Sequence, residues 1–581
     1  MEKKGKRGDL HHINKWRKFR IFLIVFLLFN LIVFEALYLI YGTALQSKLQ
    51  ENNIEYDEYG GWSNYPPELG SPVATGFFAV QKLNNRWWFV DPLGNPFILK
   101  GMNCVGYTNS VLTTEKSEFD ILNKYSSKAE WAPDVANLLR NWGFNNLGEW
   151  SDSALYGSKY NLSRFIAVNV VGCVGGGCSD ITEPCTTDFF DPSFNSSADI
   201  WIKNQVLPWK DNPLIMGYFC DGELFWGQDW RTEETLIQAF FMMEEVAPGR
   251  IYLLNWLVNR TESVETFNSI WGTSINQWTD IENLEYDDFR PRNDQAQLLS
   301  DEWAQLCAEM YHNVSSHWIR KYDSNHLLFG TRYPDLPSDH ILNGTSKFVD
   351  ALVHSGYRWE PRIERLDSII PKLDVPMFYH EFAWESMETG HPNAIMGSPV
   401  TFTEAQRSLG YYYYLEEFMR RPYALGFAYF SWTDGKNTQF IYGEGNGFIS
   451  TKGRPHYKYA KIATYVNTLL EIWHIEGGTD VAIRIFDASG YIGLIAVILG
   501  IIINIGYQKL WNTKGGKIKE KMSRFKPKSK AIRILGKIGK VLLLICFDFC
   551  LLVAVFVPVV YWMWLGPLEP KTVFNDLFYY R

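Results

Sequence analysis

Residues 213–223 read PLIMGYFCDGE and residues 375–384 read VPMFYHEFAW, and these two stretches decide the predicted fold. Each is an apolar run that leads into a glutamate, Glu223 in the first and Glu381 in the second. Continuous apolar runs are typical of parallel strands that are buried on both faces. Both glutamates are therefore expected at the carboxyl ends of buried strands.

Eight strand-like segments of this kind follow one another, with helix-like segments between several of them. The strands are predicted over residues 97–104, 144–150, 165–171, 215–220, 326–333, 348–354, 376–382 and 425–432. Repeated strand–helix alternation is typical of an α/β protein with a (β/α)8 TIM barrel. Glu223 then ends the fourth strand and Glu381 the seventh. A hairpin with a turn at Asn84 and Asn85 is expected before the first strand.

Three further apolar stretches are long enough to cross a lipid bilayer as helices. Transmembrane helices are predicted at residues 20–42, 487–507 and 541–565. Residues 1–20 hold eight Lys and Arg, and residues 508–540 hold twelve. The positive-inside rule places the basic tail 1–19 and the basic loop 508–540 in the cytoplasm. The prediction is an integral membrane protein in the cell membrane or a secretory-pathway organelle.

In that arrangement the barrel domain, residues 43–486, lies on the extracellular or lumenal side, and residues 566–581 form a short external tail. The barrel domain holds 34 basic and 56 acidic residues, a net charge of −22. Such a charge argues against nucleic acid and against a strongly anionic substrate. Its N-x-Ser/Thr sequons predict a glycoprotein. They begin at Asn161, Asn195, Asn259, Asn313 and Asn343.

Two carboxylates at the ends of barrel strands are what glycoside hydrolysis with retention requires. One carboxylic acid protonates the leaving oxygen while the other, ionised and about 5 Å away, attacks the sugar. A lone glutamate at a strand end is more often a surface charge or a helix cap. The pair on strands four and seven makes Glu223 and Glu381 the predicted catalytic residues. Residues 224–325 are predicted as an insertion at the same face of the barrel.

Six segments of the chain also resemble a known family when they are taken in order. They are WWFVDPLGNPFILKGMN (87–103), GFNNLGEWSD (143–152), GYFCDGELFWG (217–227), MFYHEFAW (377–384), FSWTDGKNT (430–438) and GFISTKGRPHYKYAK (447–461). Together they resemble the β-agarase-like glycoside hydrolases of the retaining (β/α)8-barrel clan, here fused to membrane-spanning segments. The resemblance covers roughly residues 76–465.

The resemblance implies roles for particular residues. Glu223 would be the acid/base and Glu381 the nucleophile, with Trp432 as the aromatic platform under the sugar. Tyr357 lies where related enzymes often hold a residue that touches the nucleophile. The chain departs from the family at Gly222, where the family usually has an asparagine that binds a sugar hydroxyl. This departure puts the substrate, the rate and even the activity in question.

Other residues at strand ends are candidates for substrate binding, each with a structural alternative. Asn103, Trp150 and Asp152 are expected either to bind sugar hydroxyls or to build the barrel rim. Arg332 is expected to pair with Glu381, as a pKa-lowering partner or as a structural ion pair. The remaining candidates are His354, at the end of strand six, and Trp384, which either stacks on a sugar or packs in the core. His380 is expected in barrel packing because it alternates with Glu381.

Two functions from different classes fit these observations. The first is a membrane-anchored retaining glycoside hydrolase or transglycosylase that acts on a neutral polysaccharide or glycan. The second is a weakly active or inactive glycan-binding scaffold that partners a membrane polysaccharide synthase or exporter. Gly222 and the elaborate anchoring favour the second function, and the two glutamates favour the first. The chemistry requires no metal and no organic cofactor.

Overall fold

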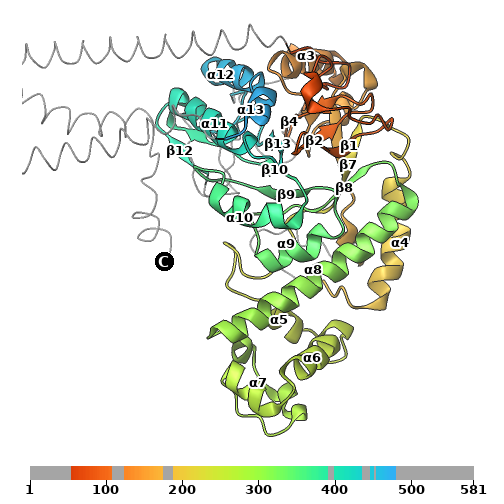
Figure 1. The fold of residues 1–581 in the computed structure, drawn as a ribbon, viewed down its shortest axis with the longest axis vertical. Helices are drawn as coiled ribbons and strands as arrows, with labels where there is room; N and C mark the ends of the chain where they lie inside the picture. The colour runs from red at the N-terminus through yellow and green to blue at the C-terminus, as the bar shows by residue number, and fades with distance from the viewer. Residues whose placement is uncertain are drawn as a thin grey trace, which may run out of the picture. The chain divides into compact units, whose positions relative to one another are not determined.

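The computed structural model describes residues 54–107, 124–174, 187–389, 398–434, 445–450 and 453–478. Eight parallel strands form one sheet in the order β8-β7-β6-β5-β4-β13-β10-β9 (Figure 1). These strands are β4 (Leu99–Met102), β5 (Asn146–Leu147), β6 (Ser163–Ala167), β7 (Ile215–Asp221), β8 (Leu327–Thr331), β9 (Leu352–Ser355), β10 (Met377–Glu381) and β13 (Ala424–Tyr429). Each corresponds in order to one of the eight predicted strands.

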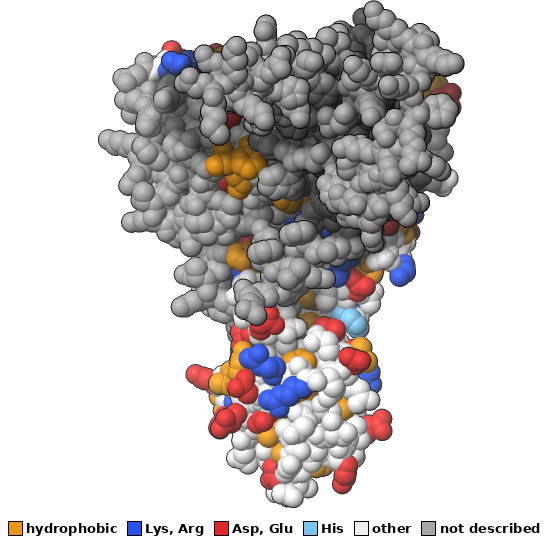
Figure 2. All heavy atoms as spheres, turned by 90° about the vertical axis from the view of Figure 1, so that its left-hand side faces the viewer, with side chains coloured by type: hydrophobic (Ala, Val, Ile, Leu, Met, Phe, Trp, Pro, Cys, Tyr) orange, Lys and Arg blue, Asp and Glu red, His pale blue; other side chains and the backbone are white. Residues whose placement is uncertain are grey.

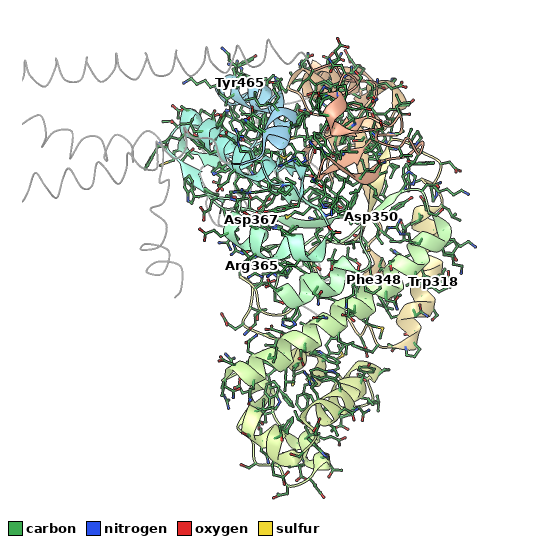
Figure 3. All side chains as sticks on the ribbon, in the orientation of Figure 1. Trp318, Phe348, Asp350, Arg365, Asp367 and Tyr465 are labelled. Atoms are coloured by element: carbon green, nitrogen blue, oxygen red, sulfur yellow. The ribbon has the colours of Figure 1, made fainter. Side chains whose placement is uncertain are left out.

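Hydrogen bonds between the β8 region and the β9 region nearly close this sheet into a barrel. The Asp350 amide donates to the Leu328 carbonyl (2.8 Å), and the Ser355 amide donates to the Tyr333 carbonyl (2.8 Å). The Asp350 carboxylate, labelled in Figure 3, accepts hydrogen bonds from the Leu328 amide (2.7 Å) and from Arg320 (2.6 Å). The mixed α/β fold is therefore the TIM-like barrel that the strand pattern predicts.

Helices follow most of the barrel strands. They are α3 (Lys128–Asn141), α4 (Pro192–Val206), α8 (Asp294–Tyr322), α9 (Asp339–Ser346), α10 (Ile363–Leu373), α11 (Glu404–Met419), α12 (Tyr457–Asn467) and α13 (Leu470–Glu476). After β5 two short 3-10 turns, η2 (Ser153–Leu155) and η3 (Ser158–Tyr160), stand where a helix is usual. The connection after β5 is therefore short, and it lies next to Glu149 and Trp150.

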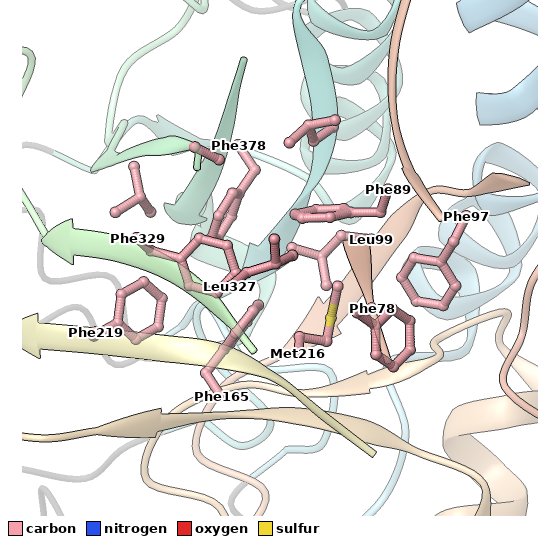
Figure 4. Packing of buried hydrophobic residues seen from close by; sticks show 13 residues of the cluster. Phe78, Phe89, Phe97, Leu99, Phe165, Met216, Phe219, Leu327, Phe329 and Phe378 are labelled. Atoms are coloured by element: carbon pink, nitrogen blue, oxygen red, sulfur yellow. The ribbon is translucent and has the colours of Figure 1, made fainter. Parts of the chain in front are cut away.

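A small antiparallel sheet precedes the barrel, as expected. It consists of β1 (Ala79–Leu83), β2 (Arg86–Val90) and β3 (Pro96–Phe97). Asn84 and Asn85 form its turn with φ of 48° and 60°, the left-handed values that asparagine tolerates. Phe78, Phe89 and Phe97 pack against apolar side chains of the barrel strands (Figure 4). This packing fills the barrel centre and leaves the carboxyl ends of the strands free for a site.

The predicted insertion contains three helices that pack against the first half of α8. They are α5 (Leu236–Phe241), α6 (Pro248–Thr261) and α7 (Val264–Trp271). Phe240 and Trp303 lie edge to face, with ring centroids 5.3 Å apart. On the face drawn in Figure 2, acidic and basic side chains are mixed over this part of the molecule. Residues 224–325 thus combine a helical subdomain with the barrel helix α8.

The prediction of an integral membrane protein requires a correction. No helix in the ranges that the structure describes is long and apolar enough to cross a membrane. The longest of them, α8, has 29 residues but carries charged side chains such as Asp301, Glu302 and Glu309. This finding contradicts the predicted localisation. The predicted spans at 20–42, 487–507 and 541–565 lie outside the described residues.

A buried ion pair joins β4 to the last described helix, α13. The Lys100 ammonium lies 2.6 Å from Glu471, and both side chains are at most 3% exposed. Lys100 also donates to the Tyr56 hydroxyl (2.9 Å). Removing one partner of such a pair leaves an uncompensated buried charge, so its three members depend on one another.

A second buried cluster joins the entry segment to the turn after β2. The Asp57 carboxylate accepts hydrogen bonds from the Tyr59 and Gly61 amides, and Asp91 accepts from the Leu93 and Asn95 amides. Burial, together with the contact with Asp57, raises the pKa of Asp91 to about 8. The two carboxyl groups therefore share one proton near neutral pH.

We expect Asp91→Asn to reduce the pH dependence of stability. The folded pKa of Asp91 lies above its unfolded value, so the folded state keeps a proton that the unfolded chain releases above about pH 4. Stability from this group is present at low pH and is lost as the pH rises towards 8, by at most about 1.4 kcal/mol per pH unit. Thermal unfolding at pH 5 and pH 8 measures the loss.

From pH 5 to pH 8, the melting temperature of Asp91→Asn should fall by less than that of the wild-type chain. Asp339→Asn is the matched control, because Asp339 sits exposed at the start of α9. An equal loss in the wild-type chain and in Asp91→Asn would contradict the shared proton.

Candidate active site

Glu223 and Glu381 lie at the same end of the barrel. Glu223 follows β7 by two residues, and Glu381 is the last residue of β10. In the order of the chain these are the fourth and seventh barrel strands. Since parallel strands end at one rim of a barrel, both carboxyl groups belong to the face where TIM-barrel enzymes carry their sites.

Three side chains hold the Glu381 carboxylate. The Tyr357 hydroxyl donates to Oε2 (2.9 Å), Arg332 Nη1 donates to Oε1 (3.2 Å), and His380 Nδ1 lies 3.4 Å from Oε1. Burial by itself would raise the pKa of Glu381, but His380, Arg332 and Tyr357 together hold it below its ordinary value. Glu381 is therefore ionised at neutral pH and fixed in orientation, as a nucleophile must be.

Glu223 has the opposite character. Its side chain is partly buried, and no hydrogen bond joins its carboxyl group to another residue in the described part of the chain. Burial and the negative charge of Glu381 raise the pKa of Glu223 to about 7. Glu223 can therefore hold a proton near neutral pH while Glu381 does not. Two carboxyl groups with pKa values pushed apart in this way can divide the roles of proton donor and ionised carboxylate.

Arg332, just after β8, connects Glu381 to the end of β5. Its Nε lies 2.6 Å from Glu149 Oε2, and its guanidinium lies over the ring of Trp150, 4.7 Å from the centroid. Burial opposes the charge of Glu149, yet Arg332 and His380 keep the pKa of Glu149 below its ordinary value. Arg332 thus lies between two ionised carboxylates, and the prediction that it pairs with Glu381 is confirmed.

His380 takes a larger part in this network than the sequence predicted. It is fully buried, as expected, yet its Nε2 lies 3.2 Å from Glu149 Oε2 and its Nδ1 reaches Glu381. The register between β10 and β9 shifts between Tyr379 and Glu381, so strict alternation of side chains fails there. That irregularity places the neighbours His380 and Glu381 in one cluster.

Asn103 supports this cluster from β4. Its Nδ2 donates to the His380 carbonyl (2.8 Å), and its own carbonyl accepts the Trp432 amide (3.0 Å). Asn103 is fully buried. In the described structure it therefore fixes the backbone beside the site.

Three predicted binding residues make structural contacts instead. Trp384 is fully buried and packs against Tyr414, with ring centroids 5.2 Å apart. His354 bonds the Ser355 carbonyl, and burial lowers its pKa to about 4. Asp152 caps η2 and pairs with Lys128 (2.7 Å). The described contacts do not bring these three side chains to Glu381.

Two tryptophans border the site in different ways. Trp150 is 37% exposed and lies edge to face with His380, so its free surface can meet a ligand. Trp432 is only 4% exposed and packs against Trp142, with ring centroids 5.8 Å apart. The peptide bond between Phe430 and Ser431, just before Trp432, is cis. The role of Trp432 as a sugar platform stays a prediction.

Gly222, the residue before Glu223, has no side chain, and Asp221 does not fill its place. Asp221 points away from it: its carboxylate accepts hydrogen bonds from the Tyr311 hydroxyl of α8 and from the Val171 amide. A side chain at Gly222 would begin 3.2 Å from Arg332 Nη2. Asp221 therefore does not replace a side chain at position 222.

Among the described residues, no group of three or more His, Cys, Asp or Glu side chains could hold a metal ion. The carboxyl pair is able to donate a proton from Glu223 and an electron pair from Glu381 to a substrate placed between them.

Tyr357→Phe should move the acidic limb of the pH–rate profile upward. The lost hydrogen bond stabilises the charged form of Glu381, so its removal raises the pKa of Glu381. The basic limb reports Glu223 and should stay near pH 7. Tyr457→Phe is the control because Tyr457 is 75% exposed. An unchanged acidic limb in Tyr357→Phe, measured as kcat/KM against pH, would contradict this assignment.

A search against protein-family models finds no match for the chain, but individual proteins are similar to it. β-agarase B of Vibrio sp. (strain JT0107) is 23% identical over 486 residues, which cover 70% of this chain and 49% of that protein. β-agarase A of the same strain is 21% identical over 476 residues, covering 68% and 46%. These matches support a relationship to glycoside hydrolases. The chain spans about half the length of these two relatives.

Solved structures of glycoside hydrolases share the fold. An exo-β-agarase has a TM-score of 0.59 and 19% identity, over 72% of this chain and 67% of that chain. The agarase AgWH50C has a TM-score of 0.60 and 19% identity, over 74% and 70%.

Proposed function

We propose that the chain is a retaining glycoside hydrolase that cleaves a neutral polysaccharide with Glu223 as acid/base and Glu381 as nucleophile. The opposite pKa shifts of these two carboxyl groups, on strands four and seven, carry the proposal. The β-agarase relatives make agarose the first substrate to test.

The reaction has two steps, which are formation and then hydrolysis of a glycosyl ester on Glu381. Glu381 attacks the anomeric carbon while Glu223 gives its proton to the leaving oxygen, so the glycosidic C–O bond breaks and a glycosyl ester forms. Glu223, now ionised, takes a proton from water, whose oxygen attacks the same carbon and releases Glu381. The sugar leaves with its original anomeric configuration. Transfer to a sugar hydroxyl in place of water would make the chain a transglycosylase.

A neutral substrate fits the charges at the site. Arg332 is the cation that touches Glu381, and it already faces Glu149 and Glu381. Glu223 adds a third carboxyl group nearby. An anionic sugar would meet this excess of acids, so uncharged hydroxyl groups are the better ligands.

The test is product stereochemistry followed directly. The full-length chain is incubated with agarose oligosaccharides and with a panel of neutral β-linked oligosaccharides, and proton NMR records which anomer appears first. Retention, together with a covalent 2-fluoro-glycosyl adduct that peptide mapping places on Glu381, supports the proposal. Glu360→Gln, a change at an exposed glutamate, is the matched control, and it should form the same first anomer and the same adduct on Glu381 as the wild-type chain.

Two results would overturn parts of it. Initial formation of the opposite anomer would replace the nucleophile role of Glu381 by that of a general base. Binding of the oligosaccharides without cleavage would favour the glycan-binding scaffold, the reading that Gly222 suggests.

A further inference from the structure

The Nη2 nitrogen of the Arg332 guanidinium is available to bind a ligand. Its Nε faces Glu149 and its Nη1 bonds Glu381, but Nη2 has no hydrogen-bond partner among the described residues. The Arg332 side chain is 7% exposed, and Nη2, unlike Nε, is not among its fully buried atoms that lack a hydrogen-bond partner. An accessible, charged donor beside a nucleophile is well suited to bind a substrate oxygen.

Gly222 determines where this nitrogen lies. A Cβ at position 222 would approach Nη2 to 3.2 Å, closer than most such contacts. The guanidinium therefore rests against the backbone just before the acid/base Glu223, in space that a side chain would occupy. The same guanidinium thus contacts Glu381 through Nη1 and lies against the residue before Glu223 through Nη2.

The plane of the guanidinium is fixed on the other side. Its centre lies 4.7 Å above the ring of Trp150, and Trp150 is packed on His380. Two carboxylates and one aromatic ring leave the fork of Arg332 little freedom. A donor held in this way can form its bond without further loss of side-chain entropy.

We propose that Arg332 Nη2 donates a hydrogen bond to the substrate hydroxyl on the carbon next to the reacting one, and that Gly222 makes this contact possible. The inference rests on the proposed glycosidase function. A hydrogen bond to that hydroxyl strengthens in the transition state of glycoside hydrolysis and selects sugars that carry it. A neutral hydroxyl is the expected ligand because Glu149 and Glu381 already balance the charge of Arg332.

The experiment compares two probes on four forms of the full-length chain. The probes are the aryl β-glycoside that the wild-type chain cleaves fastest and its 2-deoxy analogue. The forms are wild type, Gly222→Ala, Arg332→Lys and Gly157→Ala. The last is the matched glycine control, since its nearest contact for a Cβ is an ordinary 3.5 Å and it is the N-cap residue before η3. The readout is a ratio: kcat/KM for the aryl β-glycoside divided by kcat/KM for its 2-deoxy analogue.

The ratio should fall about tenfold or more in Gly222→Ala and in Arg332→Lys, the usual loss for a charge-assisted hydrogen bond. It should stay within about twofold of wild type in Gly157→Ala. Equal losses on both probes would overturn the inference and leave the glycosidase function standing, because a general fault in folding or in Glu381 affects both probes alike. Gly222→Ala keeps every charge, so it decides the matter if Arg332→Lys fails to fold.

Failure of the proposed glycosidase function would appear as a lack of cleavage by the wild-type chain, and the contact is then tested by binding alone. If the wild-type chain cleaves no glycoside, the probes become the aryl β-glycoside that it binds most tightly and its 2-deoxy analogue, and calorimetry measures their binding to Glu223→Gln and to Gly222→Ala/Glu223→Gln. Weaker binding of the 2-deoxy probe, lost in Gly222→Ala/Glu223→Gln, supports the contact, and equal binding of the two probes overturns it.

Discussion

Replacing Glu381 by glutamine is expected to lower kcat by about 10⁴-fold or more, as the loss of one member of a catalytic set does in other hydrolases. Glutamine keeps the size of the side chain; its oxygen can accept from Arg332, and its amide NH2 can donate to the Tyr357 hydroxyl, so the fold should persist. It cannot form the glycosyl ester, because an amide oxygen is a poor nucleophile. Initial rates on the best substrate, with circular dichroism to check folding, measure the effect.

The two glutamates should fail in different ways. Glu223→Ala should regain its first step on a substrate whose leaving group needs no proton, such as a dinitrophenyl glycoside, because acid catalysis is then dispensable. Added azide should speed its second step and release a β-glycosyl azide. Glu381→Gln should respond to neither change. The same rescue pattern in both variants would contradict the assignment of roles.

Replacing Arg332 by methionine is expected to destabilise the chain by about 3–5 kcal/mol. The change leaves Glu149 and Glu381 buried together without the cation that faces both of them. Urea unfolding at pH 7 measures the loss. The effect should shrink at low pH, because protonation of either carboxylate removes the uncompensated charge.

Two further variants isolate the cause of this loss. Adding Glu149→Gln to Arg332→Met removes one orphaned charge and should recover part of the stability. Arg365→Met is the matched control; Arg365, labelled in Figure 3, pairs with Asp339 at the surface, so its loss should cost about 1 kcal/mol or less. If Arg332→Met costs no more than Arg365→Met, the buried network does not support the fold.

The barrel could be predicted from the chain because its strands are buried on both faces. Segments such as 215–220 and 376–382 are continuously apolar, and such runs have few alternatives to a parallel sheet covered by helices. The two glutamates were also predictable, since a strand count alone places Glu223 and Glu381 at one rim. The pairing of Arg332 with Glu381 followed from the same argument.

The details of the site depend on local departures that apolar patterns do not encode. The register shift in β10 brings His380 to Glu381, although alternation predicted the opposite. Trp384 and His354 lie close to strand ends in sequence, yet packing against Tyr414 and Tyr379 keeps both in the core. Burial of an aromatic or a neutral histidine is favourable, so position in the chain does not decide which side it faces.

The ion pair between Lys100 and Glu471 bears on how the molecule acquires its shape. It ties the first barrel strand to the last described helix, across some 370 residues of chain, and Tyr56 joins from the entry segment. Until α13 has been synthesised, Lys100 has no counter-charge, and closing a loop of this length is slow. The nascent polypeptide must therefore hold its first strand in an unfinished, water-accessible state for most of translation. Its need for protection from aggregation is greatest during that interval.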